Sequence, residues 1–377
     1  MNKLLTVYDD TEPLNNVVNA LSMDVNEVFY LYHHEEHRTA FTNIRKVIRG
    51  YKNIALHFIR PVDDAKEIDQ ILKDNDDVIV DVGGSKYLSL LLFDYANRNG
   101  NRIIYFDHEE NVIKDYRTHT IIEQEIFKLT IKDVLMLRGG EITEYMHKGA
   151  TDTRTKETIY QLFNDNLNNY SALMNYLSYL NKVLCGAKKV GNRAFRITKE
   201  QISEIKKDRC YAKIGDLFTI EGDRIVFKTA RLVDVVTVSG TLLENYLYLK
   251  LLDAGQFDDV RMSVVVDFSD DRYDHPVKCE IDLLAIYNNR LMFVSCKSNK
   301  VETPALNEIY VHNSMFGNAL SVPVICVCED IDRHSPSMYA KAEELGIYMI
   351  DKSNMTELDF PEVFHRIITG AYKYDSL

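Results

Sequence analysis

The sequence predicts an α/β protein with two α/β domains: an N-terminal doubly wound parallel sheet and a C-terminal α/β domain, joined by a connector. Two patterns carry this prediction. Strand-like segments alternate with helix-like segments through the first hundred residues, which is typical of a parallel sheet covered on both faces. In the last third, three strand-like segments follow one another, which predicts an antiparallel meander. With 377 residues, 46% of them apolar, the chain can build more than one core.

Five strands and four helices are predicted in the N-terminal region. The first helix begins at Thr11-Glu12-Pro13, where an N-cap residue precedes a proline in the first turn, and apolar residues then recur at helical spacing. A helix rich in leucine covers 85–96. The strands are expected at 3–8, 28–32, 54–59, 78–82 and 103–106, and the other helices around 41–48 and at 63–73.

The chain changes pattern after this region. Residues 111–150 predict a mixed connecting region, followed by helices near 170–185 and 198–207 and a hairpin at 217–228 that turns at Gly222-Asp223. The C-terminal elements are expected at 240–255 (helix), 260–268, 277–287 and 291–297 (meander), from 303 (helix), 322–327 (strand), 335–345 (helix) and 347–350 (strand). The predicted domains are 1–140, 141–230 and 231–377.

Composition and charge narrow the functional class. Acidic residues outnumber basic ones by 57 to 45, a net charge of −12, which argues against a coat protein that binds nucleic acid passively. The six cysteines show no CxxC or His-rich zinc spacing, so reduced thiols in a cytoplasmic protein are expected. No apolar run approaches the roughly 18 residues of a membrane span, so no membrane partner is expected.

One segment departs from this acidic balance. Residues 188–213 contain nine basic and three acidic side chains, with Phe195 and Tyr211 among them. With the neighbouring helix and hairpin, this segment predicts a small winged-helix-like module. Two interpretations stay open: a solvated linker helix with a wing, or a local contact with nucleic acid.

Polar residues follow the predicted parallel strands, at the sheet edge where ligands bind in open α/β folds. Gly83 and Gly84 let backbone amides approach an anion, and Ser85 caps a helix whose N-terminus favours phosphate. The pattern is neither a Walker A loop nor GxGxxG, and an ordinary tight turn is the alternative. The candidate ligand-binding residues are Asp9, Asp10, Thr11, Asp81, Gly83, Gly84, Ser85, Lys86, Asp107 and His108.

A strand followed by Asp-Val-Gly-Gly-Ser-Lys and a leucine-rich helix resembles the CRISPR-associated Rossmann-fold (CARF) sensor domain. The resemblance covers roughly residues 1–140. The usual Gly-Gly-Thr of the family is Gly83-Gly84-Ser85 here, and residues 8–11 match the first loop of the family only in position. The resemblance implies a Rossmann-like CARF domain that binds a cyclic oligoadenylate across a homodimer, where two-fold symmetry presents each loop twice to one ring.

The C-terminal meander carries a second candidate site. Because side chains alternate along a strand, Glu280 and Asp282 point the same way, and so do Ser295 and Lys297 on the next strand. Convergent carboxylates hold hard cations such as Mg²⁺ or Mn²⁺, and a lysine beside them can act on water or phosphate. The alternative is a surface charge cluster. Apolar flanks on both strands favour the metal site, since buried charges need a partner.

This arrangement resembles the PD-(D/E)xK nuclease superfamily, including its order of helix, meander, helix and strand. Asp282 matches the aspartate of that motif and Lys297 its lysine, whereas Ser295 stands where the second acidic residue belongs. Glu280 or Glu308 could supply the missing carboxylate, and Glu244 matches an acidic residue often found on the opening helix. The resemblance implies catalytic residues Asp282, Lys297, Glu280, Glu308 and Glu244, with Asp282, Glu280 and Glu308 as metal ligands.

Together the two halves resemble the CARF nuclease effectors of type III CRISPR immunity, with a restriction-endonuclease-like C-terminal domain. That family implies a homodimer activated by cyclic tetra-adenylate, with Mn²⁺- or Mg²⁺-dependent cutting of single-stranded RNA and DNA and nicking of supercoiled DNA. The alternatives are a ligand-responsive nucleic-acid-binding protein with an inactive nuclease domain, and a stand-alone restriction or repair nuclease.

Overall fold

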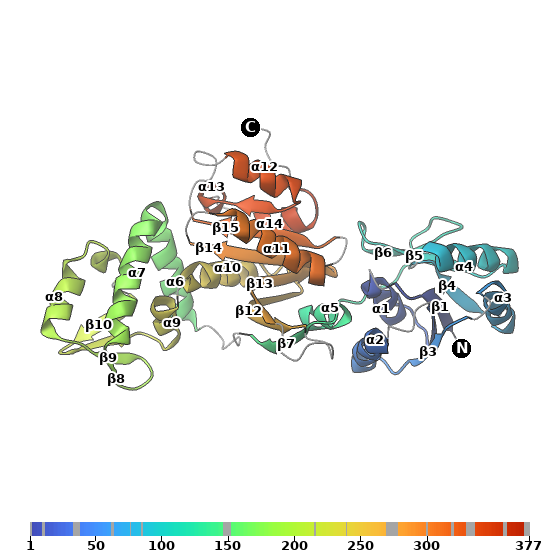
Figure 1. Cartoon of the computed structure of the whole chain (residues 1–377), viewed down its shortest axis with the longest axis horizontal. Helices are drawn as coiled ribbons and strands as arrows, with labels where there is room; N and C mark the ends of the chain where they lie inside the picture. Colours follow the sequence, from blue (N-terminus) through green and yellow to red (C-terminus); the bar gives the residue numbers. More distant parts are fainter. Residues whose placement is uncertain are drawn as a thin grey trace.

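The chain folds into three lobes in a row, with the C-terminal lobe in the middle (Figure 1). This arrangement is seen in a computed structural model. The residues that the structure describes are 2–9, 12–32, 38–61, 64–75, 77–83, 86–145, 152–214, 216–238, 240–268, 278–298, 301–317, 320–328, 336–356 and 360–372. No helix in these ranges is long and apolar enough to cross a bilayer.

The N-terminal lobe is built on a six-stranded sheet in the order β3-β2-β1-β4-β5-β6, parallel except for the β5–β6 pair. Alternate residues of β1 face opposite layers: Leu4 belongs to the core that contains α1 and α2, and Leu5 to the core that contains α3 and α4. The predicted doubly wound sheet is therefore confirmed, with β6 as an added antiparallel edge. The elements are β1 (Lys3–Val7), α1 (Pro13–Ser22), β2 (Glu27–Leu31), α2 (Arg38–Tyr51), β3 (Ala55–Ile59), α3 (Asp64–Asp74), β4 (Val78–Asp81), α4 (Lys86–Asn99), β5 (Ile103–Asp107) and β6 (Val112–Asp115).

The helical lobe, residues 153–237, combines helices with a small antiparallel sheet in the order β10-β11-β9-β8. The predicted hairpin and the short helix are confirmed. Gly222 turns the hairpin at a φ of 61°, and the Thr198 side chain caps the helix in a reciprocal capping box with Gln201. The elements are α6 (Thr153–Asn166), η2 (Leu167–Asn169), α7 (Tyr170–Cys185), β8 (Lys188–Lys189), β9 (Ala194–Arg196), α8 (Lys199–Lys207), η3 (Tyr211–Lys213), β10 (Phe218–Glu221), β11 (Arg224–Phe227) and α9 (Arg231–Thr237).

The C-terminal lobe has a six-stranded sheet in the order β16-β15-β14-β13-β12-β7. Strands β12, β13 and β14 form the predicted antiparallel meander. Asn288 and Asn289, at φ values of 48° and 63°, make the two-residue turn between β13 and β14. Glycines at positions 240 and 255, both at positive φ, flank α10. The elements are α10 (Thr241–Ala254), β12 (Asp259–Asp267), β13 (Lys278–Tyr287), β14 (Arg290–Lys297), α11 (Thr303–Phe316), β15 (Val322–Val327), α12 (Pro336–Glu344), β16 (Tyr348–Ile350), α13 (Lys352–Met355) and α14 (Phe360–Ile368).

The segment after the N-terminal lobe differs from the expected connector. It forms α5 (Ile131–Leu137), capped by Thr130, and β7 (Glu141–Glu144), which pairs with β12 of the C-terminal sheet. Gly139, at a φ of 87°, reverses the chain, and a Cβ on Gly140 would lie 2.7 Å from Val266 Cγ1. Residues 141–144 thus extend the C-terminal sheet, although the predicted boundary places them in the connector.

The two outer lobes are linked to opposite faces of the C-terminal sheet, the helical lobe mainly through α10 and the N-terminal lobe mainly through α5. Leu283 and Val294 belong to the core that also contains the apolar residues of the helical lobe. Leu284 and Phe293, one residue away on the same strands, belong to the core that contains α1, α2 and α5. The two faces of the strands that carry Asp282 and Lys297 therefore belong to two different cores, and each core is shared with one outer lobe.

Candidate functional site

Asp282 lies on β13 beside β14, as the strand register requires. Leu283 pairs with Val294, so Asp282 lies opposite Ser295. The Asp282 Oδ2 accepts a hydrogen bond from the Cys296 backbone N–H at 2.6 Å, and Ser295 Oγ lies 3.4 Å away from the same oxygen. The backbone of β14 therefore fixes the orientation of this carboxylate.

Lys297 and Glu308 approach each other from β14 and α11. The Lys297 Nζ lies 3.6 Å from the Glu308 Oε2, and the Glu308 side chain is 55% exposed, so it is free to reorient. Both carboxylates of β13, Glu280 and Asp282, line the same small cavity as the lysine. The residues around this cavity include Glu280, Asp282, Ser295, Lys297, Glu308 and His312.

His312 is a site residue that the sequence reasoning missed. It lies one helical turn after Glu308 on α11, and burial lowers the pKa of its imidazole below the usual value. A neutral imidazole therefore faces the carboxylates near neutral pH. The signal in the sequence was the i, i+4 spacing of Glu308 and His312 on the helix that follows the meander.

Glu244 belongs to the same electrostatic neighbourhood. It lies in the first turn of α10, and its pKa is raised to about 7, first by burial and then by the negative charges of Asp282 and Glu280. Gly240 makes room for this side chain, since a Cβ there would lie 3.2 Å from the Glu244 Oε1. Ser263 on β12, hydrogen-bonded to Glu244, has a left-handed φ of 48° and lies across from Asp282 in the strand register.

The donor atoms at this site suit a hard divalent cation. Burial raises the pKa of Asp282, and Glu308 adds to that rise, so a bound cation would relieve the crowding of negative charge. The carboxylates are not yet gathered, however: within the described ranges, no group of three or more His, Cys, Asp or Glu side chains is close enough to hold a metal ion. Glu280 is exposed, although the apolar flanks of its strand led us to expect buried charges at this site.

At the N-terminal site, Asp81 supports the glycine loop from beneath. Its side chain is fully buried, its Oδ1 accepts the Gly83 N–H at 3.0 Å, and its Oδ2 accepts the Thr6 hydroxyl at 2.8 Å. Burial raises the pKa of this carboxyl group. Asp81 therefore shapes the loop through these two hydrogen bonds, and its contact with a ligand stays a prediction.

The other predicted ligand residues are placed in part. Asp9 closes a turn by accepting the Glu12 N–H at 3.3 Å. Asp107 is held by Lys114 at 2.8 Å, which lowers the pKa of its carboxyl group, and His108 follows at the end of β5. Lys86 is the first residue of α4. Asp10, Thr11, Gly84 and Ser85 lie outside the described residues.

The two sites are connected through the β13–β14 turn. Arg290 Nη2 donates to the carbonyl oxygens of His108 at 2.8 Å and Glu109 at 3.0 Å. Asn289 beside it accepts the Leu129 N–H at 2.8 Å and donates to the Phe127 carbonyl at 2.9 Å. The sequence pattern predicts a hairpin here but does not indicate the contacts of its turn with residues 108–109 and 127–129. One end of the hairpin thus holds the N-terminal lobe, and the other end carries the residues of the C-terminal cavity.

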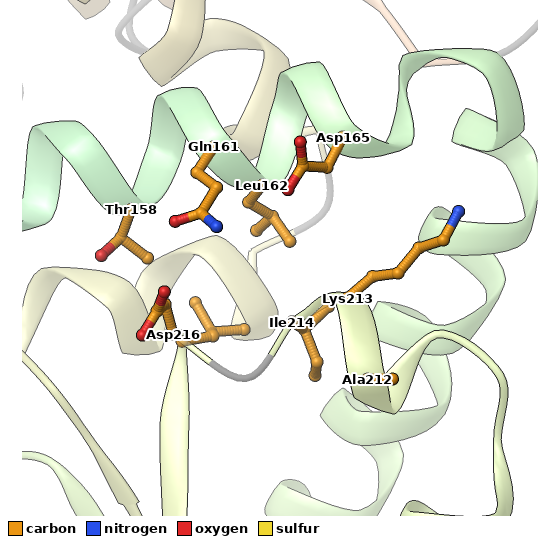
Figure 2. Close-up of a pocket in the computed structure, with 9 residues that line it drawn as sticks. Thr158, Gln161, Leu162, Asp165, Ala212, Lys213, Ile214 and Asp216 are labelled. Atoms are coloured by element: carbon orange, nitrogen blue, oxygen red, sulfur yellow. The ribbon is translucent and has the colours of Figure 1, made fainter.

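A larger hollow lies away from both sites, in the helical lobe. Figure 2 shows Gln161 and Asp165 of α6 facing the segment that contains Lys213 and Asp216 across a cavity of about 490 Å³. None of the residues that line this hollow lines the C-terminal cavity.

Comparisons with known proteins agree with this organisation. Residues 233–359 match the Card1-like endonuclease domain family. No curated protein matches the sequence. Among solved structures, protein VC1899 from Vibrio cholerae is similar over 98% of each chain, with a TM-score of 0.79 and 15% identity.

Two further structures share the architecture. Can2 from Sulfobacillus thermosulfidooxidans, solved in complex with cyclic tetra-adenylate, matches 99% of this chain and all of its own, with a TM-score of 0.70 and 16% identity. A type III CRISPR defence DNA nuclease activated by cyclic oligoadenylate matches 97% of this chain and 51% of its own, with a TM-score of 0.52 and 15% identity. The chain therefore shares its fold with VC1899 and Can2 over nearly the whole length of each, and residues 233–359, which include the meander, match the Card1-like endonuclease domain family.

Proposed function

We propose that this protein is a metal-dependent nuclease that a cyclic oligoadenylate activates and that cuts single-stranded RNA and DNA in antiviral defence. One observation carries the proposal: Asp282, Lys297 and Glu308 converge on one cavity in a segment that matches an endonuclease family. Two observations support a cyclic oligoadenylate as the activator: the CARF resemblance of the N-terminal sequence, and the fold shared with Can2, which was solved in complex with cyclic tetra-adenylate.

The residues divide the chemistry between them. Asp282 would be the first ligand of Mg²⁺ or Mn²⁺, because the Cys296 amide already orients it. Glu280 or Glu308 would supply the second carboxylate in place of Ser295. The bound ion would polarise the scissile phosphodiester. Lys297, released from Glu308, would orient the attacking water or stabilise the charge that develops on the phosphate.

The N-terminal lobe would bind cyclic tetra-adenylate at the carboxyl edge of its sheet. Asp9, Asp10, Thr11, Gly83, Gly84, Ser85, Lys86, Asp107 and His108 are the proposed contacts. Tyr87 and Leu90, which are 58% and 69% exposed at the start of α4, supply an apolar surface beside this edge for a second copy of the chain. A homodimer built there would present two loops to one ring.

The β13–β14 hairpin is the proposed route of activation. A ligand that displaces the loop at His108 would act directly on the guanidinium of Arg290. The hairpin would pass that displacement to Asp282 and Lys297 at its other end. Activation requires only that the ligand binds the arrangement with gathered carboxylates more tightly than the resting one.

The proposal is tested with labelled single-stranded RNA and DNA in the presence of cyclic tetra-adenylate. Cleavage in Mn²⁺ that disappears in EDTA and in Asp282→Asn supports a metal-dependent nuclease that uses this cavity. Cleavage that survives in Asp282→Asn would place the activity elsewhere.

A second candidate is a ligand-responsive nucleic-acid-binding protein without nuclease activity. Ser295 at the motif position and the ungathered carboxylates favour it. It predicts tight binding of cyclic tetra-adenylate and nucleic acid with no product in Mn²⁺ or Mg²⁺.

A further inference from the structure

The helical lobe contains most of the unbalanced positive charge of the chain. Residues 188–213 hold nine basic and three acidic side chains, a net +6, whereas the remaining 36 basic and 54 acidic residues give −18. All nine basic residues are exposed. They belong to the part of the lobe farthest from the N-terminal sheet (Figure 1). The net negative charge of the chain is already sufficient for solubility, so solubility does not explain why basic residues cluster at 188–213.

On α8, the charges form one outer face. Lys199, Lys206 and Lys207 are exposed, whereas Ile205 on the opposite side is fully buried. Tyr176 of α7 donates to the Ile205 carbonyl at 3.1 Å and so helps to seat the inner side of the helix. The helix is therefore fixed by its apolar side and presents its lysines outward.

On the small sheet, basic residues lie side by side on the outer face. Lys188 pairs with Arg196 across β8 and β9, and Arg196 pairs with Arg224 across β9 and β11. The inner face of the same strands holds Phe195 and Ile225, which are buried. Like charges opposite one another destabilise a sheet. The carboxylate of Asp223, 2.9 Å from Arg196 Nε, offsets only part of this repulsion.

Most of these charges have no acidic partner. In the portion of the chain that the structure describes, no carboxylate lies within ion-pair distance of Lys188, Lys199, Lys206, Lys207 or Arg209. The lobe shares one core with the C-terminal sheet, so its surface is held in a fixed place relative to the cavity around Asp282.

We infer that this basic surface binds the sugar-phosphate backbone of the nucleic acid that the C-terminal lobe cleaves. The inference rests on the proposed nuclease function and adds a second binding surface outside the catalytic cavity. An extended polyanion matches charges spread over a helix and a sheet better than a single small anion does. Because the surface binds phosphates, binding is sequence-tolerant and falls steeply with salt.

The test compares two charge reversals of equal size in the full chain. One double variant, Lys206→Glu with Lys207→Glu, reverses two charges of the basic surface. The control double variant, Lys46→Glu with Arg49→Glu, reverses two exposed charges on α2 and so changes the net charge by the same amount. Binding of a labelled single strand of about 30 nucleotides is measured in EDTA at several salt concentrations. We expect the Lys206→Glu, Lys207→Glu variant to bind the strand at least tenfold more weakly at 100 mM salt. The slope of log K, the logarithm of the association constant, against log salt should also become shallower, by about 0.7 for each phosphate that the variant no longer neutralises. The α2 pair should change binding less than threefold.

Cleavage kinetics separate this inference from the nuclease proposal. With the activator present, the α8 variant should raise KM for the long strand and leave kcat unchanged. Cleavage with an unchanged KM and unchanged binding would overturn the surface while the nuclease stands. A parent that binds through this surface but never cleaves would support the surface as a binding site and reject the nuclease. The inference would be overturned if both double variants weakened strand binding equally. It would also be overturned if the α8 variant changed only the oligomeric state, as measured by sedimentation.

Discussion

The guanidinium of Arg290 donates to the backbone carbonyl of His108 at 2.8 Å, across the boundary between the C-terminal and N-terminal lobes. Arg290 also donates to the Ile368 carbonyl at 3.1 Å, so this one side chain joins the loop after β5, the meander and the last helix. Bonds from a charged donor are stronger than those between neutral groups. The loop proposed to touch the activator is thus attached to the strand pair that carries Asp282 and Lys297.

Arg290→Met should uncouple activation from ligand binding. The variant keeps the apolar stem of the side chain but leaves the carbonyls of His108 and Glu109 without their donor. We expect the ratio of activated to basal cleavage to fall at least tenfold, while cyclic tetra-adenylate still binds. Arg261→Met is the matched control, since Arg261 pairs with Asp259 inside the C-terminal lobe. Equal loss in both variants would show a general effect on the fold.

Asp282→Asn should abolish cleavage without destabilising the protein. Asparagine keeps an acceptor for the Cys296 N–H but removes the charge that burial disfavours, as the raised pKa of Asp282 indicates. The cleavage rate should fall at least 100-fold, because a metal ion contributes on the order of several kcal/mol to stabilising the transition state. The Tm should stay equal or rise. Glu344→Gln, on the exposed side of α12, should change neither quantity. A large drop in Tm would show that Asp282 acts in folding instead.

Glu244→Gln should flatten the dependence of stability on pH. The folded protein holds the pKa of this carboxyl group near 7, whereas an ordinary glutamate titrates near 4.5. The folded state therefore binds the proton more tightly, and stability decreases as pH rises from about 4.5 to 7, by about 3 kcal/mol at most. The variant should be more stable than the parent at pH 8, and this difference should vanish near pH 4.5. Denaturant melts at the two pH values would measure it, and a constant difference would contradict the burial of this charge.

Asp81→Ala should weaken activator binding through the shape of the glycine loop. The change leaves the Thr6 hydroxyl and the Gly83 N–H without their buried acceptor, a cost of about 1–3 kcal/mol for each group. We expect lower affinity for cyclic tetra-adenylate by calorimetry and a lower midpoint of unfolding. Of the hydrogen bonds to Asp81, Thr6→Val removes only the one from Thr6, and it should show the smaller loss of affinity. Unchanged affinity in Asp81→Ala would mean that the loop holds its shape without this carboxylate.

Local signals were sufficient for most of the elements. Asn288-Asn289-Arg290, between two strand-like segments, predicts a hairpin, and Asn288 and Asn289 adopt the positive φ of a tight turn. Strand parity predicts that Asp282 and Lys297 face one side, and both line the same cavity. In each case a few neighbouring residues determine the geometry, so the sequence alone carries the information.

Long-range features could not be predicted in this way. The contact between Arg290 and His108 spans 182 positions and depends on how two lobes pack. The strand at 141–144 joins the C-terminal sheet because Gly140 lets the chain pass against Val266, which no local pattern indicates. The i, i+4 spacing of Glu308 and His312 shows only that they share a helix face, and the place of that face at the cavity depends on how α11 packs beside the meander.

The most direct measurement is the initial rate of cleavage of labelled single-stranded RNA and DNA in Mn²⁺, with and without cyclic tetra-adenylate, in one preparation of the full chain. We predict cleavage that depends on the activator and disappears in Asp282→Asn. Equal cleavage without the activator would contradict a sensor that controls the nuclease. Binding of the activator with no cleavage in either condition would contradict the nuclease itself and leave Ser295 as the mark of an inactive site.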